Sequence, residues 1–388
     1  MVKKRALFYL SGYDPRGVRY YHSLYKKESK KQTTLNGLTI EVSSRKRISP
    51  HIDSWKITAK NEDKTIETMY LFLGYDDIIR KRWKRSVFEL IKDMWFYVVT
   101  YFFTGTLFRL IQASPAQAIP LIYPVLYLVV SLVFVVWLLL IGASFLSAFI
   151  PFVVALMVLV YPLYKLLEIF LDFGEKITVF WLLRIYLFSA HYAKNEIENI
   201  DERIELFVSH IVKQIDEASK NGVDEVLIVA HSVGSILLIS ILQKVLSTID
   251  SQKKLPQISI VTLGQCIPLV SFLKSATTYK NQMKDIVSYN NFTWIDYSSK
   301  IDGASAPFLD YFKHANIKTK GKNSPYYLST RFHLLYDKNH YKQLKKNRFV
   351  VHFLYLMSTD KQGEYDFFKI TSGCTFLKNY IKDKKSLV

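Results

Sequence analysis

The chain has 388 residues, of which 50% are hydrophobic and 22% are charged, and this composition excludes an intrinsically disordered protein. Its formal net charge of +19 favours an anionic partner. The basic residues form no recognisable nucleic-acid motif, so we expect a lipid surface as partner and no nucleic acid. A generally basic composition without a specific target is the alternative. The two cysteines, Cys266 and Cys374, form neither a metal motif nor a disulfide framework.

Residues 1–86 are predicted to form the first part of a soluble α/β domain. The run Arg5–Leu10 is typical of a strand, the loop Ser11–Tyr13 follows it, and a helix is expected from Val18. The apolar part of this strand is too short for a secretory signal peptide, so none is expected.

Residues 87–190 are predicted to be a membrane-embedded helical insertion. Ile119–Ile141 and Ser144–Tyr164 contain no Asp, Glu, Lys or Arg, and each is long enough to cross a hydrocarbon core, which takes ~20 residues. Only Gly142-Ala143 separates them. The pattern predicts a transmembrane hairpin with its turn at these two small residues; a pair of buried core helices is the alternative.

The charges that flank this hairpin predict its orientation. The turn carries no Lys or Arg, whereas basic residues lie on both outer sides: Arg80, Lys81, Arg82, Lys84 and Arg85 before it, and Lys165, Lys176 and Arg184 after it. The positive-inside rule then places both soluble parts in the cytoplasm, in a multi-pass protein of the inner or plasma membrane.

Two further apolar segments flank the hairpin. Trp95–Ile111 and Ile177–Ser189 contain Arg109 and Arg184, respectively, and are rich in aromatic residues. We expect interfacial or obliquely packed helices there. If both segments span the membrane instead, the number of spans is four and the orientation is unchanged.

Residues 191–388 are predicted to complete the soluble domain, and a serine follows one of its strands. Asp201–Asn221 has the periodicity of an amphipathic helix and ends at Gly222. Val226–Ala230 is typical of a short buried strand, and Ile236–Leu246 of a helix. Between them lies a turn centred on Ser232. A serine in a sharp strand-to-helix turn is held in a strained conformation with its hydroxyl directed out of the sheet.

The segment Ala230-His231-Ser232-Val233-Gly234 resembles the G-x-S-x-G motif of the α/β-hydrolase superfamily, especially its lipases and esterases. Alanine replaces the first glycine of the motif and is also small. The resemblance implies a mostly parallel sheet flanked by helices, with the hydrophobic hairpin inserted into this fold. It implies Ser232 as the nucleophile and the N–H of Val233 as an oxyanion donor. The alternative is an ordinary strand-to-helix turn that contains a serine.

In this superfamily the catalytic acid follows the serine in the chain, and the histidine comes last. Phe292–Tyr297 is predicted to be a strand, and the loop after it contains Asp302-Gly303, which resembles the loop that carries the acid. Asp296, inside the strand, is the second candidate. Either aspartate is alternatively a turn-forming or structural residue.

The catalytic base is expected to be His352, in the apolar stretch Arg348–Met357 near the end of the chain. His333 is the second candidate, and His314 and His340 are expected at the surface. The alternative for His352 is a structural histidine in the core.

The loop after the first predicted strand, Ser11–Tyr13, resembles the hydrolase loop that donates the second oxyanion N–H, here that of Tyr13. An ordinary turn is the alternative. The resemblance therefore implies a membrane-anchored serine hydrolase that cleaves carboxylic esters, of lipids or other acyl compounds, through an acyl-enzyme, without a cofactor or a metal. An acyltransferase or thioesterase with the same triad and an inactive membrane scaffold are the alternatives. The substrate and the oligomeric state are not predicted.

Overall fold

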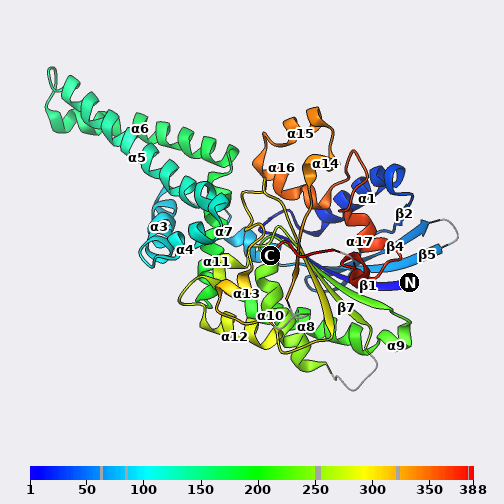
Figure 1. Ribbon diagram of the computed structural model, residues 1–388. Helices are drawn as coiled ribbons and strands as arrows, with labels where there is room; N and C mark the ends of the chain where they lie inside the picture. The colour runs from blue at the N-terminus through cyan, green and yellow to red at the C-terminus, as the bar shows by residue number, and fades with distance from the viewer. Residues whose placement is uncertain (62–63, 84–85, 250–254, 320–323, 383) are drawn as a thin grey trace.

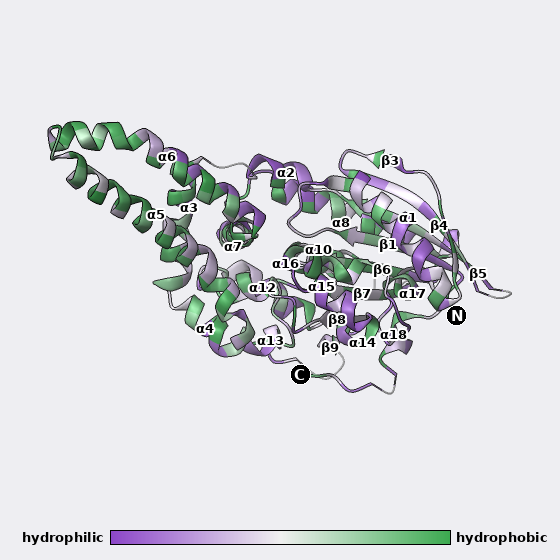
Figure 2. Ribbon diagram, turned by 90° about the horizontal axis from the view of Figure 1, so that it is seen from above, coloured by the Kyte–Doolittle hydropathy of each residue, from purple (hydrophilic) through white to green (hydrophobic). Residues whose placement is uncertain are grey.

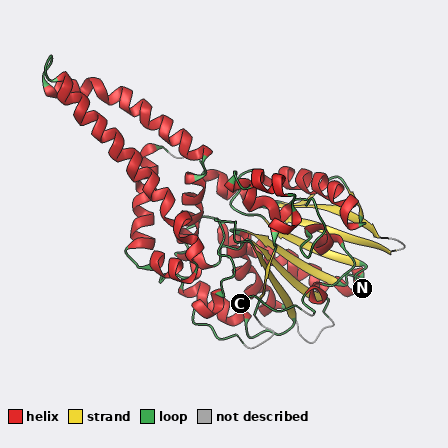
Figure 3. Ribbon diagram, turned by 45° about the horizontal axis from the view of Figure 1, so that its top comes forward, coloured by secondary structure: helices red, strands yellow, loops and turns green. Residues whose placement is uncertain are grey.

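A large mixed sheet lies between layers of helices, and a long helical hairpin projects from one end of the molecule (Figures 1 and 3). The computed structural model describes residues 1–61, 64–83, 86–249, 255–319, 324–382 and 384–388. Lys84 and Arg85, two of the flanking charges, lie outside the described residues. The architecture confirms the predicted α/β class with a mostly parallel sheet flanked by helices.

The described residues form one nine-stranded sheet with the order β2-β4-β5-β1-β6-β7-β8-β9, and β3 pairs with β4. From β5 to β9 all neighbours are parallel, whereas β2, β3 and β5 are antiparallel to β4. The strands are β1 (Lys4–Leu10), β2 (Thr39–Val42), β3 (Lys46–Ser49), β4 (Ile52–Asn61), β5 (Lys64–Leu73), β6 (Glu225–His231), β7 (Gln257–Leu263), β8 (Phe292–Ser298) and β9 (Tyr326–Ser329).

Both faces of the central strands are buried, which explains why these strands have continuous apolar sequences rather than an alternating pattern. In β1, Phe8 and Leu10 belong to one hydrophobic core, and Leu7 and Tyr9 belong to the core on the opposite face. β6 has the same division and no exposed residue. The two strands pair in parallel, with Leu10 opposite Ala230, so their carboxyl ends lie side by side.

Helices cover each face of the sheet. Residues of α1 and α17 belong to the core on the face of Leu7, and residues of α7, α8, α10 and α12 to the core on the face of Phe8. The helices outside the hairpin are α1 (Gly17–Asn36), α2 (Asp76–Lys81), α3 (Val87–Tyr97), α4 (Thr106–Ala113), α7 (Val179–Ala193), α8 (Ile200–Asp216), α9 (Ala218–Asn221), α10 (Gly234–Thr248), α11 (Pro268–Ser271), α12 (Thr277–Ile286), α13 (Tyr311–His314), α14 (Phe332–Leu335), α15 (Lys338–Leu344), α16 (Arg348–Phe353), α17 (Phe367–Ser372) and α18 (Leu377–Tyr380).

The projecting hairpin consists of α5 (Ala118–Leu146) and α6 (Phe152–Lys176). Both helices are long and apolar enough to cross a membrane, and only 11% of the most apolar part of each is buried in the protein. Figure 2 shows that hydrophobic residues dominate the hairpin. These exposed apolar surfaces disfavour the alternative of two buried core helices.

The predicted turn at Gly142-Ala143 is wrong, because α5 continues through both residues and the chain turns at residues 147–151. Gly142 is instead a contact between the two helices. A Cβ atom at Gly142 would lie 2.9 Å from Leu159 Cδ1 of α6, so the glycine permits a close approach of the helices. Pro151, the last residue of the turn, directly precedes α6 as its N-cap.

The segments on either side of the hairpin differ from each other. α3 continues into a short π-helix, and the helix direction then changes by 66° before α4 begins. The three elements together form a broken apolar segment. α7 is packed inside the protein, and every residue of it except His191 is buried. Of the two expectations for Ile177–Ser189, this burial favours a packed helix over an interfacial one. Arg184 is tolerated in this buried helix because it pairs with Glu175 and its guanidinium lies over the ring of Trp83.

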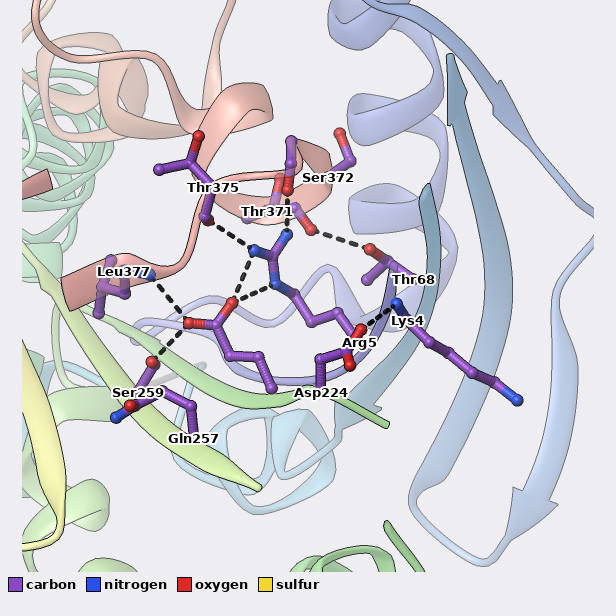
Figure 4. A network of polar contacts seen from close by, with 12 residues as sticks. Lys4, Arg5, Thr68, Asp224, Gln257, Ser259, Thr371, Ser372, Thr375 and Leu377 are labelled. Atoms are coloured by element: carbon purple, nitrogen blue, oxygen red, sulfur yellow. Dashed lines mark hydrogen bonds and ion pairs between the residues drawn. The ribbon is translucent and has the colours of Figure 1, made fainter. Parts of the chain in front are cut away.

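A buried ion pair lies at the amino ends of β1 and β6 (Figure 4). Arg5 Nη2 lies 2.6 Å from Glu225 Oε2, and the guanidinium also donates to the main-chain oxygens of Gly373 and Thr375. Glu225 Oε1 accepts hydrogen bonds from Ser259 Oγ at 2.6 Å and from the N–H of Leu377 at 2.9 Å. This network attaches the C-terminal segment to the sheet.

Candidate active site

Ser232 occupies a sharp turn between β6, which ends at His231, and α10, which begins at Gly234. Its φ angle is +54°, a left-handed conformation that is strained for any residue with a side chain. The N–H of Ser232 donates to the carbonyl oxygen of Leu263 at the end of β7, at 2.9 Å. The neighbouring strands therefore hold the strained backbone in place, as the predicted strand-to-helix turn requires.

Two glycines allow the loop after β1 to lie against this turn. A Cβ atom at Gly234 would lie 2.5 Å from the carbonyl oxygen of Ser11, and one at Gly12 would lie 2.8 Å from Ser232 Cβ. Neither separation is possible for real atoms. The backbone of the loop thus reaches the serine only because both positions lack a side chain.

Asp302 and His352 form a buried pair. His352 Nδ1 lies 2.9 Å from both carboxylate oxygens of Asp302, and the two side chains are 1% and 2% exposed, respectively. Asp302 also accepts hydrogen bonds from Tyr355 Oη at 3.0 Å and from the N–H of Ala304 at 3.1 Å. Burial by itself would raise the pKa of the Asp302 carboxyl, but His352 and the hydrogen bond from Ala304 hold the pKa below its usual value. The carboxylate is therefore ionised and fixes the orientation of the imidazole.

His231 connects this pair to the serine. Its Nε2 donates to the carbonyl oxygen of His352 at 2.8 Å, and the two imidazole rings lie 4.8 Å apart. Burial lowers the pKa of His231 to about 3. The ring is neutral near pH 7, and since its proton is on Nε2, Nδ1 is a hydrogen-bond acceptor.

The serine and the catalytic-base candidate do not hydrogen-bond directly in this structure. The contact of Ser232 Oγ is with Cys266 Sγ, at 3.7 Å. His352 Nε2 is buried and has no hydrogen-bond partner among the described residues. Because His352 Nε2 has no partner among these residues, it is available to accept a proton. In enzymes without bound substrate, the hydrogen bond between the nucleophile and its base is often long and shortens only in the reacting complex.

The second candidates lie in other environments. Asp296 accepts from Thr262 Oγ1 at 3.0 Å, and burial raises its pKa to about 7. His333 is exposed on α14. His340 and His314 are also exposed, as expected; the first pairs with Asp360 and the second stacks on Phe272. The structure therefore pairs His352 with Asp302 and not with Asp296, and it links His352 to the turn of Ser232 only through His231. His333 lies outside this cluster.

The two predicted oxyanion donors belong to two backbone segments that lie against each other, the turn of Ser232 and the loop after β1. Val233 directly precedes α10, where the first N–H groups of a helix have no partner inside the helix. In the loop after β1, Tyr75 Oη donates to the carbonyl oxygens of Ser11 and Gly12 at 2.6 and 3.2 Å. Because the N–H and C=O of a trans peptide point in opposite directions, the N–H of Tyr13 points away from Tyr75.

Trp181 is a site residue that the sequence analysis missed. It lies on α7, its ring is 5.3 Å from that of His352, and its Nε1 donates to the carbonyl oxygen of Tyr13 at 3.2 Å. A Cβ atom at Gly303 would lie 3.1 Å from Pro120 of α5. The apolar insertion thus contacts both the histidine and the loop of the aspartate. No local sequence pattern indicates this contact, because it joins segments that are far apart in the chain.

Among the residues that the structure describes, no group of three or more His, Cys, Asp or Glu side chains is arranged to hold a metal ion. No family model matches the chain, and no curated protein and no solved structure matches it significantly.

Proposed function

We propose that the protein is a membrane-anchored serine hydrolase of the α/β-hydrolase type that cleaves carboxylic esters of lipids or other acyl compounds. One observation carries the proposal: the strained Ser232 directly follows His231, whose ring lies 4.8 Å from that of His352, and His352 is paired with Asp302 while its second imidazole nitrogen has no partner among the described residues. Buried polar atoms are usually paired, so an unpaired one beside a strained serine supports a catalytic role.

In the proposed reaction, Ser232 Oγ attacks the ester carbonyl while His352 Nε2 takes the hydroxyl proton. Asp302 holds the imidazole in the required tautomer and stabilises its charged form. The N–H groups of Val233 and Tyr13 stabilise the negative oxygen of the tetrahedral intermediate. His352 then protonates the leaving alcohol, and water, deprotonated by His352, attacks the acyl-enzyme and releases the acid.

The hairpin supports a position at a membrane. With Ser147–Pro151 as the outer turn, which carries no Lys or Arg, both soluble parts are proposed to lie on the cytoplasmic side of a multi-pass protein. The contacts of α5 and α7 with the site support a position of the site close to the bilayer, where an acyl ester of a lipid would be the available substrate class.

The proposal is tested with the full chain in detergent micelles, by labelling with a fluorescent fluorophosphonate and by hydrolysis of short and long acyl esters. The wild type is expected to be labelled and active, and Ser232→Ala is expected to abolish both. His352→Ala is expected to lower both by several orders of magnitude. His333→Ala, which changes an exposed histidine, is the control and is expected to match the wild type. Labelling of Ser232→Ala at the wild-type rate would refute the assignment of the nucleophile.

Product analysis separates the two alternative activities. A product in which the acyl group has moved to an added lipid alcohol would identify an acyltransferase, and faster cleavage of thioesters a thioesterase. A folded wild type that neither reacts with the fluorophosphonate nor cleaves any ester would indicate an inactive scaffold, in which the contact of Ser232 with Cys266 persists.

A further inference from the structure

A polar cavity of about 420 Å³ lies at the base of the hairpin, away from the serine. Its lining residues include members of α4, α11, α12 and α13, and these helices lie close together in Figure 1. Its volume is within the range of small-ligand sites. The cavity is lined by Arg109, Gln112, Ala113, Ser271, Phe272, Lys280, His314, Ala315 and Asn316.

The charges that line this cavity have one sign. Arg109 and Lys280 form no ion pair with a described carboxylate, and the lining contains no acidic residue. Arg109 donates to Thr106 Oγ1, and Lys280 donates to the carbonyl oxygen of Leu273, both neutral acceptors. Partial burial, together with the positive charges of Arg109 and Lys284, lowers the pKa of Lys280. Two uncompensated cations across a cavity repel each other, and an anion between them would remove this repulsion.

A neutral group in the same cavity also lacks a partner. Ser271 is 1% exposed, and its Oγ makes no hydrogen bond to any described residue. A buried hydroxyl of this kind costs free energy unless a ligand or water completes its hydrogen bonds. The hydroxyl and the two cations together form a set of donors for an oxyanion.

The cavity lies next to the proposed membrane surface. α4 ends at Ala113, directly before the first apolar span, which begins at Pro115. Phe108 of α4 is exposed, and so are Phe102 and Phe103 in the segment just before α4. Exposed aromatic residues are typical of the level of lipid headgroups. Arg109 is therefore placed near headgroup depth, where a phosphate ester of a lipid is the most abundant anion.

We propose that this cavity binds the phosphate headgroup of an anionic phospholipid through Arg109, Lys280 and Ser271. This binding is independent of ester hydrolysis at Ser232. It would fix the rotation and depth of α4 relative to the bilayer, and hence the position of the hairpin base.

The test uses the full chain in micelles that contain equal amounts of phosphatidylglycerol and phosphatidylcholine, with native mass spectrometry of the lipids that remain bound. The wild type is expected to retain phosphatidylglycerol preferentially. Arg109→Gln/Lys280→Gln is expected to weaken this retention about tenfold or more, and Ser271→Ala by a smaller factor, about threefold. The control is Lys26→Gln/Lys27→Gln, which removes the same charge from exposed positions of α1, far from the hairpin in Figure 1.

An equal loss in the control pair would show that binding follows net charge alone, and it would overturn the proposal. Retention of phosphatidylglycerol by the cavity variants at the wild-type level would do the same. In a separate arm, inorganic phosphate or glycerol 3-phosphate is added at the concentration of the lipid. Complete displacement of phosphatidylglycerol by either would assign the cavity to a soluble anion and overturn the lipid assignment, whereas failure to displace it supports the assignment.

Discussion

The two ends of β1 and β6 contain buried polar residues in opposite states. At the amino ends, the charged atoms of Arg5 and Glu225 are satisfied by each other, by main-chain atoms of the C-terminal segment and by Ser259 (Figure 4). At the carboxyl ends, Ser11 Oγ, His231 Nδ1 and His352 Nε2 have no hydrogen-bond partner among the described residues. The same two strands thus support a saturated network at one end and an unsaturated one at the other.

The difference indicates what each end does. A buried network in which every polar atom has a partner stabilises the contact between chain segments, and it has no free donor or acceptor with which to bind a ligand. Unpaired buried acceptors beside a strained residue reduce stability and persist where the protein uses them. We therefore expect changes at the amino end to affect folding and changes at the carboxyl end to affect activity.

Among the changes that compare the two ends, the largest effect is expected from Asp302→Asn, which replaces one carboxylate oxygen of the carboxyl-end cluster by an amide nitrogen. The amide cannot hold the His352 tautomer that accepts the serine proton, so kcat should fall by about 10⁴-fold with little change in the thermal unfolding midpoint. Ester hydrolysis and thermal unfolding in detergent measure both quantities. Asp296→Asn, which changes a buried carboxyl outside the cluster, is the control and should keep kcat within a few-fold. Wild-type activity of Asp302→Asn would remove Asp302 from the site.

The amino end is tested by Glu225→Gln. Leaving the Arg5 guanidinium buried without its counter-charge should lower the free energy of unfolding by about 3–5 kcal/mol, whereas kcat per folded molecule should not change. Arg5→Met/Glu225→Leu removes both charges and should recover most of this loss. If the single variant loses activity while its stability is unchanged, the division between the two ends does not hold.

A smaller loss is expected from Gly12→Ala at the carboxyl end. The new Cβ atom would lie 2.8 Å from Ser232 Cβ, so the loop that carries Tyr13 must move away from the serine. A displacement of this kind should reduce kcat/KM by about 10²-fold. Gly37→Ala, at a position where a Cβ atom meets nothing within 4 Å, is the matched control and should cost only stability. Equal kcat/KM values for the two variants would show that the loop takes no part in the reaction.

The smallest effect, when it is measured per pH unit, concerns the pH dependence of stability. Burial lowers the pKa of His231 from 6.5 to about 3, so between these values the unfolded chain binds a proton that the folded chain does not. This contribution to stability is present above pH 6.5 and is lost as the pH falls towards 3, by about 1.4 kcal/mol per pH unit. His231→Gln should reduce this slope, as measured by unfolding midpoints from pH 7 to pH 4. An unchanged slope in His231→Gln would contradict the assignment.

Much of the α/β frame could be predicted from the sequence, because its signals are local. The apolar run of β6, the small residues around Ser232 and the periodicity of α10 indicate a strand, a turn and a helix through short-range sterics and hydrogen bonds. The uncharged lengths of α5 and α6 likewise indicate helices able to cross a membrane. The catalytic role of Ser232 and the orientation in the membrane remain predictions.

Only the tertiary structure decided which distant residues meet. The order of β7 and β8 and the path of the loop after β8 place Asp302, rather than Asp296, beside His352, and composition does not distinguish the two aspartates. Gly142 is a helix contact rather than a turn because Leu159 packs against it, and α7 is buried because the hairpin base and the sheet domain enclose it. Periodicity and turn chemistry act over a few residues, whereas these outcomes depend on packing between segments far apart in the chain.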